Sequence, residues 1–205
     1  MRFTLLAFVA LALPMTANAT EEPPHQTLVK EGKFELRQYE STLVAEVEIT
    51  GDMRRAGNSG FRPLADFIFG NNTTRDKIEM TAPVTRVKSE KIEMTAPVTR
   101  TMTDTDTWTV AFVMPSEWTM ETLPMPNNPD VTIRQVPGEL MATVKFSGIG
   151  REQTFEKKQI ALESWIAEQG LEIVGAPRYA GYDAPWVPGP FRRNEVMIPV
   201  QTDNL

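Results

Sequence analysis

FELRQYESTLVAEVEITG (Phe34–Gly51) and VTIRQVPGELMATVKFSG (Val131–Gly148) are two copies of one pattern, displaced by 97 positions along the chain. Six positions are identical without a gap, and Arg37 and Arg134 form one of these pairs. In both copies apolar residues alternate with polar ones, which is typical of strands. Each copy therefore predicts a strand, a short turn and a second strand that ends at a glycine.

A helical pattern follows each copy. The second copy precedes a helix predicted over Arg151–Gln169 and closed by Gly170. The first copy precedes a weaker helical pattern over 52–69. Two glycines and Pro63 interrupt this pattern, so regular helix is predicted only over Phe61–Phe69. Each half of the chain is thus expected to contribute one helix.

Both units then finish in further strands. The predicted strands are Ile78–Arg86, Ile92–Arg100, Trp108–Met114, Arg178–Tyr182 and Asn194–Val200. The first two carry the same sequence, KIEMTAPVTR, and the short VKSE connection between the copies predicts an antiparallel hairpin.

Two β-β-α-β units in tandem predict an α+β domain with pseudo-twofold symmetry. The expected architecture is a distorted antiparallel β-barrel with two flanking helices, since a curved sheet must cover its apolar face. We expect one domain over residues 31–205, with internal halves at about 31–122 and 130–205. The proline-rich stretch at 123–129 joins these halves.

The first 19 residues read as a cleavable signal peptide. Arg2 precedes an apolar stretch that is too short to span a bilayer, and cleavage is predicted after Ala19. Residues 20–30, which include His25, are polar and proline-containing and are predicted to form a flexible leader. We therefore expect an exported protein, periplasmic or secreted, without stable membrane insertion.

The composition excludes several classes of function. The chain of 205 residues has a net charge of −6, no cysteine and one histidine, which removes disulfides, thiolate chemistry and multi-histidine metal sites. A pI near 5.0 argues against nucleic acid as a partner. We find no nucleophile elbow, phosphate loop or calcium-loop spacing, so no enzymatic activity is indicated.

Methionines and a polar C-terminal segment supply candidate contacts. Met80 and Met94 fall on apolar strand faces, where they either line a pocket or fill the core. Arg192 and Arg193 either clamp a ligand carboxylate at a pocket mouth or pair with a nearby acid to fix the loop. Glu195, at the start of an apolar strand, is expected to point inward.

These residues resemble the SOUL haem-binding protein family. The resemblance rests on the K-I-x-M-T-x-P-V strand (from Lys77 and again from Lys91), the AGYD-x-P segment from Ala180 and the RRNEV segment from Arg192, and it covers about Glu35–Val200. It implies the same duplicated barrel, and haem or a related tetrapyrrole held in a largely apolar cleft against the first helix.

The resemblance leads to a specific expectation: a monomeric carrier, buffer or scavenger of haem. The expected contacts are Phe61, Leu64, Ala65 and Ile68 on the helix, Met80 or Met94 on the adjoining strands, and Arg192 or Arg193 at the rim. The family region contains no histidine, so a Met, a Tyr or solvent would meet the iron, and the metal ligand is unknown.

The architecture is also similar to GyrI-like effector-binding domains, which suggests an alternative. In that case the ligand is a planar or cationic organic molecule other than haem, and Glu195 is its polar contact. Tyr182 is a further candidate beside Glu195, and the two would also be the pair for acid–base chemistry if the protein were an enzyme.

Overall fold

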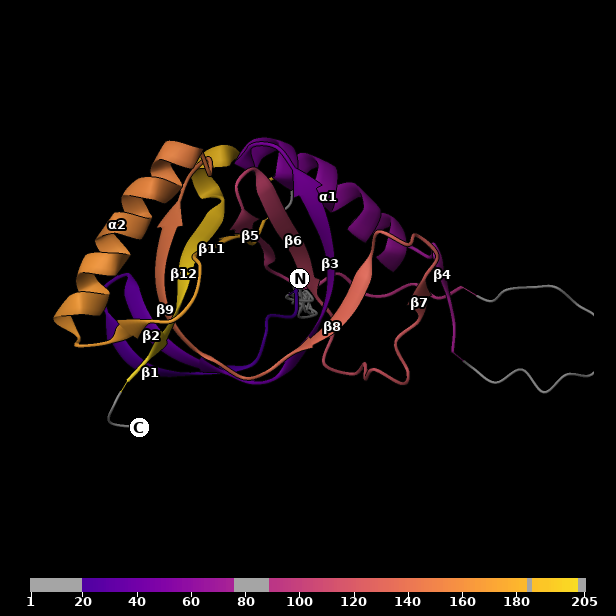
Figure 1. Cartoon of the computed structure of the whole chain (residues 1–205), viewed down its shortest axis with the longest axis horizontal. Coiled ribbons are helices and arrows are strands. Elements are labelled where there is room, and N and C mark those ends of the chain that lie inside the picture. The colour runs from indigo at the N-terminus through magenta and orange to yellow at the C-terminus, as the bar shows by residue number, and fades with distance from the viewer. Residues whose placement is uncertain (1–19, 76–88, 184–185, 203–205) are drawn as a thin grey trace, which may run out of the picture.

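The computed structural model describes residues 20–75, 89–183 and 186–202 (Figure 1). The sheet strands are β1 (His25–Glu31), β2 (Phe34–Tyr39), β3 (Thr42–Thr50), β5 (Val98–Asp104), β6 (Thr107–Val113), β8 (Thr132–Val136), β9 (Leu140–Ser147), β10 (Glu172–Ile173), β11 (Arg178–Gly181) and β12 (Arg193–Gln201). The helices are α1 (Met53–Ile68), α2 (Glu152–Glu168) and the short η1 (Gly189–Phe191), and β4 (Asn72–Thr73) pairs separately with β7 (Met125–Pro126). The predicted signal peptide, the predicted strand at 78–86 and Met80 lie outside the described residues.

The strands form one strongly curled antiparallel sheet in the order β1-β2-β9-β12-β11-β5-β6-β3-β8, with β10 added beside β12. Both long helices lie on the outer, convex side of this half-barrel (Figure 1). Helix α1 packs on β3, β6 and β5, and α2 packs on β9 and β12. The predicted α+β class, with two helices flanking a curled antiparallel sheet, is confirmed.

The two repeats exchange their first strands. β2 pairs with β9 of the second repeat, placing Phe34 opposite Val144, and β8 pairs with β3 of the first, placing Val136 opposite Thr42. The third strands of the two repeats, β5 and β11, pair with each other near the centre of the sheet and so join its two halves. Each half therefore completes the sheet of the other, and neither has a core of its own.

The main core lies between the helices and the sheet. Leu64 and Ile68 of α1 and Phe155 and Leu162 of α2 are almost completely buried there. Because side chains alternate along a strand, every second residue of the sheet points into this core and the others point to the concave side.

Helix α1 is longer than predicted. It begins at Met53 rather than Phe61, and the Oδ1 atom of Asp52 caps it by accepting the backbone N–H of Arg55 at 2.7 Å. Gly60 serves packing here, since a Cβ at this position would lie 2.5 Å from a methyl group of Val110. The glycine that weakened the sequence prediction is thus what lets α1 lie close to β6.

Two further predictions are corrected. Residues 25–30, predicted to be a flexible leader, belong to β1, which pairs with β2 along its length. The strand predicted from Ile92 begins only at Val98, because Pro97 has no N–H to donate to a ladder. Ile92 instead anchors an irregular segment in the core. No helix among the described residues is long and apolar enough to cross a membrane.

Candidate functional site

A cleft of about 530 Å³ lies between the N-terminal ends of α1 and α2. Four arginines line it: Arg54, Arg100, Arg151 and Arg192. Three acids also border it, namely Asp52, Glu152 and Asp183, but Asp52 caps α1 and Asp183 accepts the backbone N–H of Arg193. We call this feature the basic cleft.

Arg100 is the unusual member of the cleft. Its guanidinium lies over the ring of Phe155, 5.4 Å from the centroid, and its Nη1 atom donates to the backbone oxygen of Met53 at 3.4 Å. Within the described chain it pairs with no carboxylate, and burial lowers its pKa. Gly57 leaves room for the guanidinium, since a Cβ there would lie 3.1 Å from Nη1.

The helix ends add to the positive character of the cleft. Asp52 and Arg151, the residues that precede α1 and α2, both line it, so the first turns of both helices face the same space. Free backbone N–H groups and the helix dipole favour an anion at such a position. An anionic group in the cleft would therefore meet two helix ends and the partly buried Arg100 together.

An exposed apolar surface adjoins this charge. Ile149, which lines the cleft, is 54% exposed, and the loop between Asp183 and Arg192 carries Trp186 and Phe191, which are 83% and 77% exposed. The same loop contacts Ile149 through Gly189, where a Cβ would lie 2.5 Å from Ile149 Cγ1. The surroundings thus suit a ligand with an anionic edge and an apolar body.

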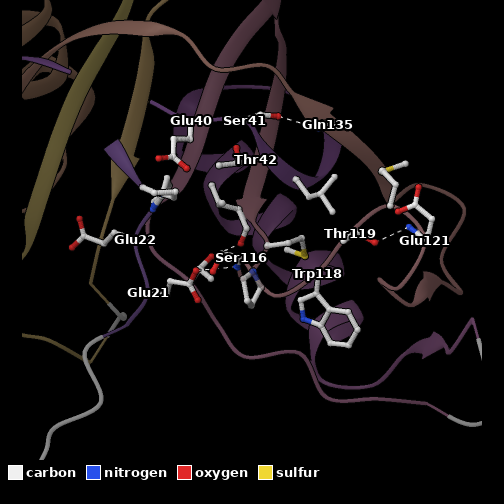
Figure 2. Close-up of a pocket in the computed structure, with 18 residues that line it drawn as sticks. Glu21, Glu22, Glu40, Ser41, Thr42, Ser116, Trp118, Thr119, Glu121 and Gln135 are labelled. Carbon is white, nitrogen blue, oxygen red and sulfur yellow. Dashed lines mark hydrogen bonds between the residues drawn. The ribbon is translucent and has the colours of Figure 1, made fainter. Parts of the chain in front are cut away.

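A second cavity, of about 440 Å³, lies beside the adjoining ends of β3 and β6 (Figure 2). Residues 21–24 form one wall, and Leu43, Met114 and Trp118 contribute apolar surface. The indole N–H of Trp118 is buried without a hydrogen-bond partner in the described structure.

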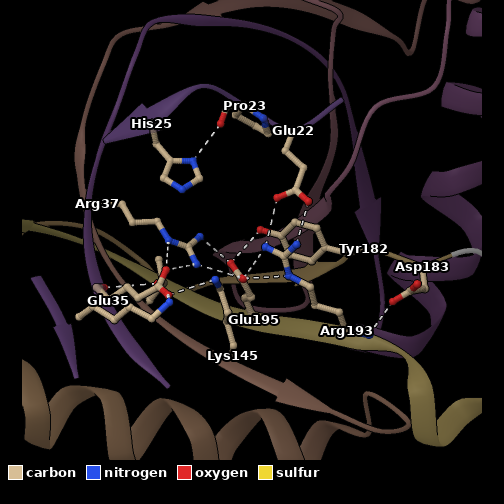
Figure 3. A network of polar contacts seen from close by, with 12 residues as sticks. Glu22, Pro23, His25, Glu35, Arg37, Lys145, Tyr182, Asp183, Arg193 and Glu195 are labelled. Atoms are coloured by element: carbon tan, nitrogen blue, oxygen red, sulfur yellow. Dashed lines mark hydrogen bonds and ion pairs between the residues drawn. The ribbon is translucent and has the colours of Figure 1, made fainter. Parts of the chain in front are cut away.

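The concave side of the sheet carries a buried ionic network around Glu195 (Figure 3). Both carboxylate oxygens of Glu195 accept from Arg37, at 2.9 and 3.2 Å. Glu195 also accepts from Arg193, at 2.8 and 3.1 Å, and from the Tyr182 hydroxyl at 2.7 Å. Glu195 and Arg37 are fully buried, which confirms that Glu195 points inward.

In this network the positive side chains of lysines and arginines compensate the buried carboxylates. Burial alone would raise the pKa of Glu35, but bonds from Lys30, Arg37 and Lys145 lower it to about 2. Burial opposes ionisation of Glu195 too, yet its arginine partners hold its pKa below the usual value. A cationic ligand would have to displace an arginine from Glu195, which disfavours the alternative site on this residue.

Tyrosines border the same network. Burial raises the pKa of Tyr39 to about 12, and burial with the nearby Glu195 charge raises that of Tyr182 further. His25 packs against Tyr39, with ring centroids 4.8 Å apart, and its Nδ1 atom lies 3.0 Å from the Pro23 oxygen. The Tyr182 hydroxyl donates to Glu195, whereas the Tyr39 hydroxyl accepts from Nη1 of Arg37 at 2.8 Å.

The helix residues predicted to contact a ligand lie in the core. Leu64 and Ile68 are at most 1% exposed and Ala65 is 8% exposed, while Phe61 packs on Phe112 with ring centroids 5.3 Å apart. A ligand would reach Leu64 or Ile68 only if α1 moved off the sheet. The apolar stripe is covered by protein, and the end of α1 that borders the basic cleft is its N-terminal turn.

The structure separates the other predicted contacts. Met94 is partly buried against the core. Arg192 lines the basic cleft, and its Nε atom donates to the Val187 oxygen at 2.8 Å. Arg193 instead points into the Glu195 network. Sequence reasoning missed Arg100. Alternation from Val98 places this arginine on the core-facing side of β5, and a charged residue at such a position is a signal that could have identified it.

The curled antiparallel sheet, the two flanking helices and the duplicated chain together define an α+β domain of the half-barrel class. The sequence pattern of the "SOUL heme-binding protein" family matches residues 20–90 and 86–199. The chain belongs to this family. It is 28% identical over 188 residues to human heme-binding protein 2, covering 89% of this chain and 87% of that protein.

Solved structures confirm the fold. The C-terminal domain of EcmrR superposes with a TM-score of 0.59 at 13% identity, covering 87% of this chain and 98% of that one. A structure described as a hydrolase from Listeria innocua superposes with a TM-score of 0.55 at 14% identity, covering 85% of this chain and 94% of that one. At these identities the likeness concerns architecture alone.

Proposed function

We propose that the protein binds haem, or a related tetrapyrrole, at the basic cleft, and acts as an exported carrier, buffer or scavenger. The propionates of haem would lie against Arg100 and the two helix ends. The apolar face of the macrocycle would lie along Ile149 and the aromatic loop. Membership of the SOUL family supports the ligand class.

One observation carries the position of the ligand. Arg100 is a partly buried cation whose contacts are a backbone oxygen and an aromatic ring rather than a carboxylate. Full burial of a charge without a counter-ion costs several kcal/mol, at an order of magnitude, and the partly buried Arg100 guanidinium bears part of that cost. A propionate in the cleft would supply the missing counter-ion and regain part of that free energy through charge-assisted hydrogen bonds.

The residues present fit the propionates better than they fit the iron. The one histidine of the chain, His25, lies in β1 against Tyr39 and does not line the basic cleft. In the described part of the chain no group of three or more His, Cys, Asp or Glu side chains could hold a metal ion. The proposal therefore assigns the affinity to carboxylate and apolar contacts.

A hemin titration followed at the Soret band tests the cleft. The wild-type protein should bind saturably at one-to-one stoichiometry, and Arg100→Gln should weaken binding about tenfold, the equivalent of one charge-assisted hydrogen bond. Arg134→Gln is the matched control, because Arg134 is an arginine paired with Glu46 outside the cleft. Equal loss in both variants would contradict the proposal.

His25 provides a second check. His25→Ala should leave the Soret band and the affinity unchanged, since the residue lies on the concave side. Loss of the band in this variant would move the haem site to β1 and overturn the assignment to the basic cleft.

Export has its own test. The N-terminal sequence of the protein recovered from its native cells should begin at Thr20, as the small residues before that position predict. A recovered chain that still begins at Met1 would contradict export by a cleavable signal peptide.

A further inference from the structure

The segment Glu21–Pro24 crosses the concave side of the molecule as an exposed strap. The backbone N–H groups of Ala96 and Ser116 donate to the main-chain and side-chain oxygens of Glu21, at 2.8 and 2.9 Å. The backbone N–H of Glu40 donates to the Pro24 oxygen at 3.1 Å. We call Glu21–Pro24 the strap.

The strap divides one hollow into two chambers. The outer chamber is the 440 Å³ cavity of Figure 2, and the inner one has Tyr39, Met141 and Met197 among its walls. Pro23 lines both chambers, and so do Thr42 and Val113 beneath it. With the strap displaced, the two chambers would form one groove with an apolar floor.

At its centre the strap places a carboxylate on an arginine. Glu22 binds Arg193 through both oxygens, at 2.7 Å to Nη1 and 3.1 Å to Nη2 (Figure 3). The pair is accessible, with side-chain exposures of 38% for Glu22 and 34% for Arg193. The Arg193 guanidinium is held in place by stacking on Tyr182, 3.7 Å from the ring centroid.

The buried part of the network cannot replace Glu22. Glu195 already accepts five hydrogen bonds, from Arg37, Arg193 and Tyr182. In the described structure Glu195 accepts from Nε and Nη2 of Arg193 but not from Nη1. Removal of the Glu22 carboxylate would therefore leave Nη1 facing the place that this carboxylate occupies at the edge of the outer chamber. An arginine fixed in this way presents a planar fork that fits a second carboxylate.

We propose that this groove is a ligand site for a monocarboxylate with an apolar body, and that Glu22 occupies the carboxylate position as an internal surrogate. The ligand carboxylate displaces Glu22 from Arg193, and the apolar body lies along Met141 and Met197 or extends toward Trp118. The unpartnered indole N–H of Trp118 offers a donor to a polar atom farther along such a ligand. This site is separate from the basic cleft and does not rest on haem binding.

The test compares two fluorescent probes of matched shape, pyrenebutyrate and its uncharged analogue pyrenebutanol. Glu22→Gln removes the surrogate charge, so it should tighten pyrenebutyrate binding about fivefold or more and leave pyrenebutanol within about twofold of wild type. The matched control is Glu93→Gln, which makes the same charge change at an exposed pair with Lys91. It should bind both probes as the wild type does.

Three outcomes overturn the proposal. Equal affinities of Glu22→Gln, Glu93→Gln and wild type for pyrenebutyrate would show that Glu22 occupies no ligand position. Equal tightening of both probes by Glu22→Gln would show that the strap is only a cover and that Arg193 recognises no carboxylate. The tightening of pyrenebutyrate binding by Glu22→Gln should persist in an Arg100→Gln background, which separates this site from the haem cleft. Loss of the tightening in that background would place the probe in the basic cleft and overturn the proposal.

Discussion

Arg37 on β2 and Arg100 on β5 belong to the same sheet, but Arg37 lies on its concave side and Arg100 on its core-facing side, and their charges are compensated in opposite ways. Arg37 donates to Glu35, Tyr39 and Glu195 and is fully buried. Arg100 contacts a backbone oxygen and the Phe155 ring. Arg37 therefore has its counter-ions within the protein, whereas Arg100 is free to bind the carboxylate of an external ligand.

A structural charge cluster differs from a binding site in whether the protein itself satisfies its polar groups. The Glu195 network looks more like an active site in sequence, because it gathers acids, arginines and tyrosines. Its polar groups are already satisfied, so it stabilises the exchange of β2 between the repeats. In the basic cleft Arg100 has no carboxylate partner within the described chain, so an anionic ligand can supply the missing counter-ion.

The largest expected effect comes from breaking the closed network. Arg37→Leu leaves Glu195 and Glu35 short of a buried partner, so the free energy of unfolding should fall by about 3–5 kcal/mol. The measurement is urea unfolding at neutral pH. Arg134→Leu is the control from the equivalent repeat position, where the side chain is 53% exposed and the loss should stay below about 1 kcal/mol. Similar losses at the two positions would contradict the comparison.

Acid should weaken the same network next. The pKa of Glu35 is lowered from 4.5 to about 2 in the folded protein, so its contribution is complete above pH 4.5 and is lost as the pH falls toward 2. The free energy of unfolding should therefore decrease across this range. Glu35→Gln should be less stable at neutral pH and show a shallower decrease. An unchanged slope in the variant would show that Glu35 does not carry this dependence.

Arg100→Gln should behave in the opposite manner to Arg37→Leu. Its free energy of unfolding should remain within about 1 kcal/mol of wild type, because removal of a buried charge without a counter-ion offsets the lost stacking on Phe155. Saturating hemin should therefore raise the melting temperature of wild type more than that of the variant. A loss of stability as large as that of Arg37→Leu would mean that Arg100 is a structural residue.

The smallest effect is expected at Gly57. Gly57→Ala adds a Cβ that lies 3.1 Å from Nη1 of Arg100, so the guanidinium must shift within the cleft. Hemin affinity should fall less than in Arg100→Gln, while the gain in helix propensity keeps stability within about 1 kcal/mol of wild type. Isothermal titration and urea unfolding of the same preparation measure both quantities. A fall in hemin affinity as large as that of Arg100→Gln would contradict this expectation.

Much of the fold could be predicted from the repeat. Alternation in the two copies predicted β2, β3, β8 and β9, and periodicity predicted α2 to within one residue at each end. The exchange of first strands was not predictable, because alternation defines which face of a strand is buried but not which strand lies beside it. Gly60 misled the prediction of α1, since close helix–sheet contact is a tertiary property.

The site was less predictable for a related reason. The stripe through Leu64 and Ile68 correctly marks an apolar helix face, but periodicity does not tell whether protein or ligand covers it, and here the sheet does. The sequence leaves Arg192 with two roles, a ligand contact at a pocket mouth or a contact that fixes the loop; in the structure it lines the basic cleft and donates to the Val187 oxygen. Arg100 was visible as a charge in an apolar phase of β5, yet its missing counter-ion becomes evident only in three dimensions.

The most direct measurement compares hemin with hemin dimethyl ester, in which both propionates are blocked, on the wild-type protein. We expect the ester to bind at least about tenfold more weakly than hemin, and Arg100→Gln to narrow this difference in affinity by weakening the binding of hemin alone. Equal affinities for the two ligands, unchanged by Arg100→Gln, would contradict the claim that an open arginine in the basic cleft recognises the carboxylates of the ligand.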